Sequence, residues 1–365
     1  MAKKYLGVDI GYDTLKLAVC RGRKVKKTAS VPMPANLLRD GRVTSVETMG
    51  GLLRETMKKY RIHAGNAALV LSGEAVYLRT AVMPLMNTEQ LLYNIAYEFN
   101  DYITDDIKRY VFDYAMISEP GRKKKPEKKG QEAPAQEASA PAAPAASLSP
   151  FGMESEPAED SGDTMELLAV AAPGEMIEDL REVSRKAGMK LKKAAPVESA
   201  YIALIRATAP RGAEEREYCI LDLGYHAIRM YMFRGERHMV TRALEVGLSN
   251  LDSVIADEMG VDQHLAHMYL LNNFDDCQNQ PYSVNAYNSI AIELQRAMNF
   301  YRFSNRDSQL ADVWLTGGGA VIEPLRQAIV DALDMTVHDA AELVPGGAKV
   351  KDCHSFLLAI GAAMV

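Results

Sequence analysis

A short pattern occurs once in each half of the chain, and it limits the folds open to this sequence more than any other feature. Residues 9–22 read DIGYDTLKLAVCRG and residues 222–235 read DLGYHAIRMYMFRG, aligned without a gap. Each copy predicts a strand ending at an Asp-x-Gly turn, an alternating strand, and an Arg-Gly turn into a third strand. Because solenoid repeats recur every ~20–50 residues, a unit repeated at so long an interval indicates two related domains.

The bulk properties agree with two domains and exclude several classes of protein. The chain has 365 residues, and a domain takes about 150. A formal net charge of −6 argues against a general nucleic-acid binder, which would need a basic face. We find no apolar run of the ~20 residues that a membrane span needs, and Asp9 and Gly11 interrupt any signal peptide. The four cysteines are widely spaced, which favours reduced thiols in a cytoplasm.

Residues 119–164 are the exception to this globular composition. A basic run at 122–129 is followed by a long Ala/Pro/Ser/Glu-rich stretch that ends acidic. Such a composition buries too little apolar surface to offset its ordering entropy, so we predict a disordered loop. Its basic run leaves open a weak electrostatic tether to anionic lipid.

Hydrophobic periodicity predicts the remaining elements. We expect strands at 67–83, 107–117 and 313–315 and helices at 45–60, 88–102, 174–187, 197–207, 248–270, 284–303, 322–333 and 355–364. Thr88 is the expected N-cap of the helix at 88–102.

The repeated turns and a third glycine-rich turn suggest a site for a polyphosphate. A glycine after the aspartate lets the backbone approach a ligand closely, and the N–H groups of the turn can face a phosphate. The aspartates can hold a Mg²⁺ ion through water. A strand-to-helix turn of three glycines can pass close to a ribose or a ring. The candidate binding residues are Gly11, Tyr12, Asp13, Thr14, Lys16, Gly224, Tyr225, His226, Gly317, Gly318, Gly319 and Ala320.

The order of these motifs resembles that of the actin-like ATPases, which include actin, FtsA, MreB, DnaK-type chaperones and sugar kinases. VDIGYDTLK is similar to their first phosphate motif, ILDLGYHAIR to the second, PVESA to the first connecting motif, LTGGGAVIEPL to the adenosine motif and LLAIGAAM to the second connecting motif. The resemblance implies an α/β, actin-like, ribonuclease-H-like duplicated fold of two domains with an inserted subdomain, 1C. It also implies ATP and Mg²⁺ as ligands.

The actin-like plan divides the chain into four subdomains. Subdomain IA would comprise residues 1–79, 188–215 and 340–365, and subdomain 1C residues 80–187. Subdomain IIA would comprise residues 216–247 and 300–339, and subdomain IIB residues 248–299.

Within the actin-like proteins, two segments resemble the PilM family of type IV pilus assembly. They are VMPLMNTEQLLYNIAYEFNDYI, at the entry to subdomain 1C, and IAIELQRAMNFYRFSN, shortly before the triple glycine. The family helix implies that Glu293 and Arg296 contact the ribose or base. If ATP is hydrolysed, the fold implies that Asp9 and Asp222 organise a hydrated Mg²⁺ and that Glu198 orients the water. Lys16 would then neutralise phosphate charge.

The family resemblance also implies a partner. PilM proteins dock the cytoplasmic N-terminal peptide of PilN, a membrane protein, at subdomain 1C. We therefore expect a PilN-like partner, further pilus assembly proteins and a place at the inner face of the cytoplasmic membrane, with only indirect membrane contact. Self-association stays open. Tyr93, Tyr97 and Phe99 are aromatic candidates for the groove, with core packing as the alternative for at least half of them.

Three other interpretations remain open. An FtsA-like division protein would continue into a membrane-binding amphipathic helix, whereas this chain ends at Val365. A small-molecule kinase would need larger insertions around the cleft. A degenerate adaptor without nucleotide is possible because the second turn, 225–228, carries no hydroxyl except the Tyr225 phenol. Tyr12 and Asp13 are also bulkier and more acidic than usual in the first turn.

Overall fold

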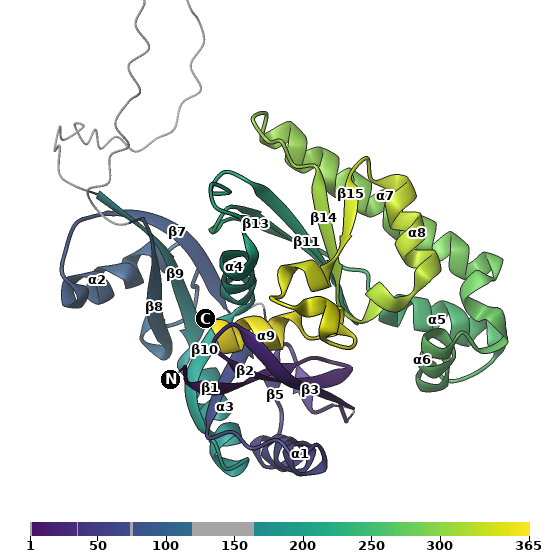
Figure 1. The fold of residues 1–365 in the computed structure, drawn as a ribbon, viewed down its shortest axis with the longest axis horizontal. Helices are drawn as coiled ribbons and strands as arrows, with labels where there is room; N and C mark the ends of the chain where they lie inside the picture. The colour runs from purple at the N-terminus through teal and green to yellow at the C-terminus, as the bar shows by residue number, and fades with distance from the viewer. Residues whose placement is uncertain (1, 35, 74–75, 119–163) are drawn as a thin grey trace, which may run out of the picture.

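A computed structural model describes residues 2–34, 36–73, 76–118 and 164–365. It contains two five-stranded sheets built on one plan (Figure 1). In each, three antiparallel strands are followed by two that run parallel to the first of them. The first sheet has the order β10-β6-β1-β2-β3 and the second the order β13-β12-β11-β14-β15. The duplication predicted from the repeat is therefore confirmed.

The bounds of the ten strands follow the repeat closely. The strands of the first sheet are β1 (Lys4–Ile10), β2 (Thr14–Arg21), β3 (Lys24–Pro32), β6 (Asn66–Leu71) and β10 (Lys190–Pro196). Those of the second sheet are β11 (Glu217–Leu223), β12 (Ile228–Arg234), β13 (Arg237–Leu244), β14 (Asp312–Thr316) and β15 (Thr336–Asp339). Two further short strands, β4 (Leu38–Arg39) and β5 (Arg42–Val43), form a hairpin beside the first sheet.

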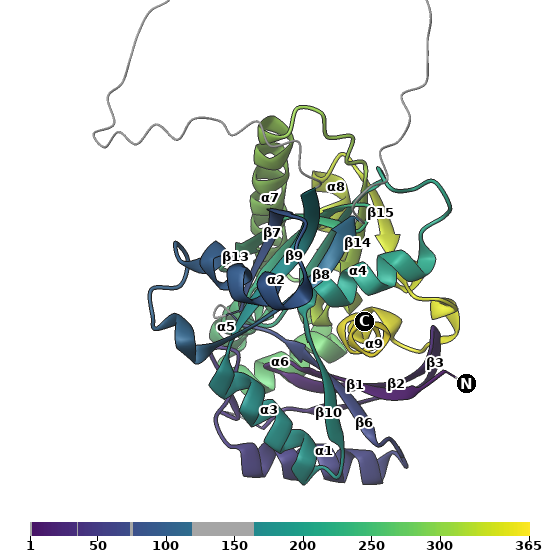
Figure 2. The ribbon, with the colours of Figure 1, turned by 90° about the vertical axis from the view of Figure 1, so that its left-hand side faces the viewer.

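Helices α4 (Val197–Thr208) and α9 (Leu357–Met364) lie between the two sheets (Figures 1 and 2). They approach closely because Gly361 lies against the backbone of Ala200, where a Cβ would come within 2.3 Å of the carbonyl oxygen. Helices α1 (Val46–Lys59) and α3 (Gly174–Lys186) cover the other face of the first sheet (Figure 2). The helix expected at 174–187 thus shares its core with the first sheet.

The second domain carries the remaining long helices. These are α5 (Leu248–Met259), α6 (Gln263–Asn272), α7 (Pro281–Ser304) and α8 (Glu323–Ala332). The prediction of one helix over 248–270 was wrong, because Gly260 ends α5 in the left-handed conformation (φ 65°) and Asp262 caps the start of α6. The helices predicted at 284–303 and 322–333 are confirmed with shifts of a few residues.

The inserted subdomain is a three-stranded sheet covered on one face by α2 (Thr88–Ile95). Its strands are β7 (Tyr77–Pro84), β8 (Tyr110–Ser118) and β9 (Thr164–Pro173), in the order β7-β9-β8. A single strand over 67–83 was a wrong prediction, since β6 and β7 belong to different sheets. The N-cap of α2 is Asn87 and not Thr88, because Asn87 and Gln90 form a capping box.

Residues 119–163, most of the segment predicted to be disordered, lie outside the described residues, and Thr164 begins β9. Among the helices that the structure describes, none combines the length and apolar character needed to cross a bilayer.

Candidate functional site

Asp9 and Asp222 occupy equivalent places at the ends of β1 and β11. Leu6, Val8 and Ile10 pack into the outer core of the first domain, so strand alternation turns Asp9 toward the layer of α4 and α9. The alternation of β11 turns Asp222 toward the same layer. The two carboxylates therefore face each other from opposite sheets.

Each aspartate pairs across its hairpin with a basic residue. Lys16 stands opposite Asp9 with its Nζ 3.8 Å from Oδ2, and Arg229 stands opposite Asp222. Burial raises the pKa of the Asp9 carboxyl; Lys16 lowers it in part, and the facing Asp222 raises it again. Burial likewise raises the pKa of Asp222, while Lys16 and Arg229 lower it. Lys16 thus acts on both carboxylates, and the site favours an added cation.

The two turns touch each other across the cleft. The Tyr12 and His226 rings meet edge to face with their centroids 4.5 Å apart. The Tyr12 hydroxyl also accepts a hydrogen bond from the N–H of Gly41, 2.8 Å away. Burial lowers the pKa of His226, and Arg229 lowers it further, so a neutral imidazole is favoured here. The Tyr12–His226 contact therefore joins the first domain to the second.

A second bridge joins the first turn to α6. His267 Nε2 lies 3.3 Å from Asp13 Oδ1, and His267 Nδ1 lies 2.9 Å from Oδ2 of Asp252 on α5. Asp13 also accepts a hydrogen bond from the Thr14 hydroxyl at 2.6 Å. Sequence analysis missed His267 and Asp252, since neither lies in a recognisable motif.

The triple-glycine turn follows β14 and lies against the second aspartate. Gly317 has a φ of 89° and a ψ of −180°, a conformation that is essentially restricted to glycine. A Cβ on Gly317 would come within 2.4 Å of Asp222 Oδ1 and 2.7 Å of the Leu223 carbonyl oxygen. Gly318 and Gly319 face Leu248 at the start of α5. The structure therefore brings this turn and the second hairpin together, as predicted.

The N-terminus of α5 is anchored to the second turn. The N–H groups of Leu248 and Ser249 donate to the carbonyl oxygens of Gly224 and Tyr225, at 3.1 and 2.8 Å. Gly247 is required at this point, because a Cβ there would come within 2.4 Å of the Tyr225 carbonyl oxygen.

A buried hydroxyl among the carboxylates lacks a partner. Tyr201 on α4 is fully buried, and its hydroxyl finds no hydrogen-bond partner among the described residues. Burial raises the pKa of Tyr201 well above its usual value, and Asp222, Asp9 and Glu198 raise it further, which places all three carboxylates near its ring. An unpaired buried hydroxyl is costly, so water or a hydrated ion fits this position.

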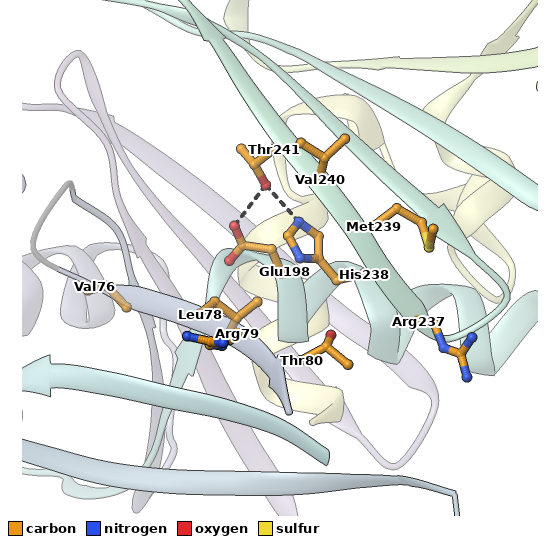
Figure 3. Close-up of a pocket in the computed structure, with 10 residues that line it drawn as sticks. All are labelled: Val76, Leu78, Arg79, Thr80, Glu198, Arg237, His238, Met239, Val240 and Thr241. Carbon is orange, nitrogen blue, oxygen red and sulfur yellow. Dashed lines mark hydrogen bonds between the residues drawn. The ribbon is translucent and has the colours of Figure 1, made fainter. Parts of the chain in front are cut away.

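Glu198 lies at the start of α4 and lines a cavity of about 560 Å³ (Figure 3). Its Oε1 accepts a hydrogen bond from the Thr241 hydroxyl at 3.1 Å, and Thr241 in turn lies 2.9 Å from His238 Nε2. The cavity separates β7 of the inserted subdomain from β13. Its lining residues are Val76, Leu78, Arg79, Thr80, Glu198, Arg237, His238, Met239, Val240 and Thr241.

Strands β7 and β13 are both edge strands of their sheets. Beside the cavity, an ion pair of 2.5 Å between Arg237 and Glu166 joins β13 to β9. The cavity is therefore a gap between two strand edges with both polar and apolar side chains in its walls.

Glu293 and Arg296 form an exposed ion pair with each other on α7, 2.6 Å apart, with side chains 54% and 71% exposed. Among the described residues, no hydrogen bond or ion pair joins them to the hairpin turns. Their predicted contact with a ribose or base stays a prediction. Of the aromatic candidates, Phe99 is buried, whereas Tyr93 and Tyr97 are 71% and 57% exposed.

The described residues contain no group of three or more His, Cys, Asp or Glu side chains arranged to hold a metal directly. A Mg²⁺ ion at Asp9 and Asp222 would therefore have to keep most of its water, as Mg²⁺ commonly does.

The two sheets share one strand plan, are joined through α4 and α9, and carry facing Asp-x-Gly hairpins. This arrangement defines an actin-like two-domain protein. The sequence model of the family described as type IV pilus assembly protein PilM matches residues 7–131 and 153–364. The chain belongs to this family. That membership favours pilus assembly over the division-protein and kinase interpretations.

Solved structures agree with the fold. A structure titled "PilM-PilN type IV pilus biogenesis complex" is 21% identical, with a TM-score of 0.71 over 99% of this chain and 97% of that chain. The ethanolamine utilization protein EutJ from Carboxydothermus hydrogenoformans is 12% identical, with a TM-score of 0.57 over 100% of this chain and 90% of that chain. No curated protein is significantly similar in sequence.

Proposed function

We propose that this protein is an ATP-binding scaffold of type IV pilus assembly that docks the cytoplasmic N-terminal peptide of a PilN-like membrane protein. The observation that carries the nucleotide half is the facing pair of Asp9 and Asp222, each with its own basic partner across a hairpin. Family membership carries the pilus half.

The nucleotide would lie with its phosphates between the two hairpin turns. The Gly11 N–H already donates to the Thr14 carbonyl oxygen, so the other backbone N–H groups of the two turns and the charge of Lys16 are the groups suited to phosphate oxygens. The turn can lie this close to Asp222 only because residue 317 is a glycine, since a Cβ there would clash with the carboxylate. Gly318, Gly319 and Ala320 would then pass beside the adenosine.

A bound Mg²⁺ would supply charge neutralisation for the phosphates. Asp9 and Asp222 would hold its water molecules, and the unpaired Tyr201 hydroxyl would bond one of them. The raised pKa values of both carboxyls fit this assignment, because a cation restores the charged form that burial disfavours.

Hydrolysis, if it occurs, would be slow. Glu198 is held by Thr241 at the cavity beside β13, and rapid hydrolysis would require it to turn toward the phosphates. We therefore propose that nucleotide occupancy serves structure and regulation more than turnover.

The peptide would dock in the cavity between β7 and β13. An extended chain can add to an exposed strand edge, where backbone hydrogen bonds supply affinity and pockets supply specificity. Both edges are open there, and Thr80, Met239 and Val240 provide mixed polar and apolar walls. The complex named in the similar structure pairs a PilM with a PilN. Docking would hold the protein at the inner face of the membrane, near further pilus assembly proteins and other copies of itself.

Calorimetry tests both the nucleotide part and the peptide part of this proposal. We expect ATP with Mg²⁺ to bind with micromolar affinity and a synthetic peptide copying the N-terminus of the PilN-like protein to bind as well. ATP binding without peptide binding would refute the pilus partner.

A degenerate adaptor that binds only the peptide is the second candidate. The contact between Tyr12 and His226 favours it, because these rings meet where phosphates would enter. Peptide binding without ATP binding in the same calorimetry would decide for the adaptor.

A further inference from the structure

The strongest unassigned feature is the bridge of charged groups that joins the first hairpin turn to the second domain. His267 on α6 lies between Asp13, on the turn, and Asp252, on α5. We call these three residues the clasp. Asp252 is fully buried and His267 is 6% exposed, so the inner half of the clasp is shielded from water.

The two halves of the clasp differ in geometry. His267 Nδ1 lies 2.9 and 3.1 Å from the two oxygens of Asp252, which is hydrogen-bond distance. His267 Nε2 lies 3.3 Å from Asp13 Oδ1, a longer contact than the one to Asp252. The Asp13 side chain is 41% exposed, so solvent screens this outer half. The outer contact is therefore the one that can open.

The imidazole is charged at neutral pH. Burial disfavours the charge, but Asp13 and Asp252 outweigh it and raise the pKa of His267 to about 9. The contact with His267 in turn lowers the pKa of Asp13; burial opposes this, while the Thr14 hydroxyl and Lys16 lower it further. Both partners are thus ionised between pH 7 and 8.

The first turn, α5 and the second turn surround the imidazole of His267 with the following groups. The first turn supplies Asp13, and α5 supplies Asp252. The second turn supplies the Tyr225 ring, edge to face with the imidazole at 5.3 Å, and the His226 ring in turn meets Tyr225 edge to face at 4.9 Å. Burial raises the pKa of Tyr225 to about 12, so its phenol adds no charge below pH 10.

We propose that His267 is a positioning residue that fixes the first phosphate turn to the second domain and so holds the cleft closed. This rests on the proposed nucleotide site, since the turn it fixes carries Gly11, Thr14 and the strand leading to Lys16. With the clasp intact, both turns move as one body around the phosphates. With the clasp broken, the first turn is held to the second domain in this region by the Tyr12–His226 contact.

The first experiment measures the release of a fluorescent ATP analogue with Mg²⁺ from the whole protein by stopped flow. His267→Gln keeps hydrogen-bonding capacity but cannot carry the charge. We expect it to release the analogue about fivefold faster or more at pH 7.5, which is the lower end of common coupling between sites. His264→Gln, an exposed histidine on the same helix, is the matched control and should release at the wild-type rate.

The pH profile separates a charged clasp from a packing role. Because the folded pKa of about 9 exceeds the ordinary value of 6.5, the stabilisation that the charged imidazole gives the folded state is complete below pH 6.5 and is lost as pH rises through 9, where the imidazolium itself loses its proton. Wild-type release should therefore accelerate between pH 8 and 10, while His267→Gln stays flat. Equal rates for the two proteins at pH 7.5, or parallel pH profiles, would overturn the proposal.

His267→Gln leaves Asp252 buried without its cation and so could destabilise the fold. A second variant therefore tests the proposal independently of the first. Asp13→Asn removes the clasp from a partly exposed position. Amide hydrogen exchange of the turn around residues 11–14 in the nucleotide-free protein should then rise several-fold at fixed pH. Unchanged exchange would refute the clasp, whereas a wild type that binds no nucleotide would refute only the proposed function.

Discussion

The Nζ of Lys16 lies 3.8 Å from Oδ2 of Asp9, and it also lowers the pKa of Asp222 on the opposite sheet. One cation therefore serves two buried carboxylates that come from the two copies of the repeat. Without it, Asp9 would lose its paired cation and only Arg229, opposite Asp222, would offset the two facing charges. This relationship makes Lys16 a structural residue as well as a candidate phosphate contact.

Lys16→Met should weaken both the protein and its nucleotide site. We expect the Kd for ATP with Mg²⁺ to rise about tenfold or more, because a contact to a charged group contributes roughly 1.5–3 kcal/mol. The nucleotide-free protein should also melt at a lower temperature. Lys24→Met, at the exposed start of β3, is the control and should change neither quantity. Unaltered affinity by calorimetry would remove Lys16 from the site.

Asp9→Asn and Asp222→Asn should have opposite effects on stability and on binding. Burial raises both pKa values, so the charged forms destabilise the folded state at neutral pH. Each variant should raise the melting temperature without nucleotide by about 2 °C, for roughly 1 kcal/mol. Each should also abolish the dependence of ATP affinity on Mg²⁺.

The sign of the pH effect provides the check on this second prediction. The native state binds the extra proton, so wild-type stability falls as pH rises through the folded pKa values. The advantage of the asparagine variants should therefore shrink on acidification. Asp257→Asn, exposed on α5, should show no advantage at any pH. Retained Mg²⁺ dependence in both variants would contradict the metal assignment.

Gly317→Ala should be far more damaging than Gly346→Ala. Both glycines have positive φ, at 89° and 73°, but only Gly317 is crowded, with Asp222 and Leu223 against its Cα. We expect Gly346→Ala to cost about 1–2 kcal/mol of unfolding free energy from the backbone alone. Gly317→Ala should cost about 3 kcal/mol and displace Asp222. Denaturant unfolding of the two variants measures the difference. Equal losses of unfolding free energy would show that the turn accommodates a Cβ at residue 317.

The sequence predicts the hairpins well because their signal is local. Asp9, Gly11 and Lys16 lie within one hairpin, where strand alternation alone decides which side chains share a face. The sequence also contains Gly260, which ends α5, and Asp262, which caps α6. The helical apolar pattern continues on both sides of them, so the sequence analysis predicted a single helix. The clasp could not be predicted, because Asp13 and His267 meet only after the two domains have packed. The same holds for Glu198 and Thr241, which no motif connects.

The last prediction locates the peptide. Thr80→Trp should fill the cavity beside β13 and abolish binding of the PilN-like peptide while ATP affinity stays unchanged. Tyr93→Ala, on the exposed face of α2, should leave peptide binding within about twofold, since an exposed aromatic contributes little unless it anchors an interface. Fluorescence anisotropy of a labelled peptide measures both. The reverse pattern, with loss in Tyr93→Ala and none in Thr80→Trp, would move the groove from the strand edges to the surface of α2. Tyr97, exposed just after the end of α2, meets the Tyr93 ring at 5.9 Å, so Tyr97→Ala would then have to lose binding as well.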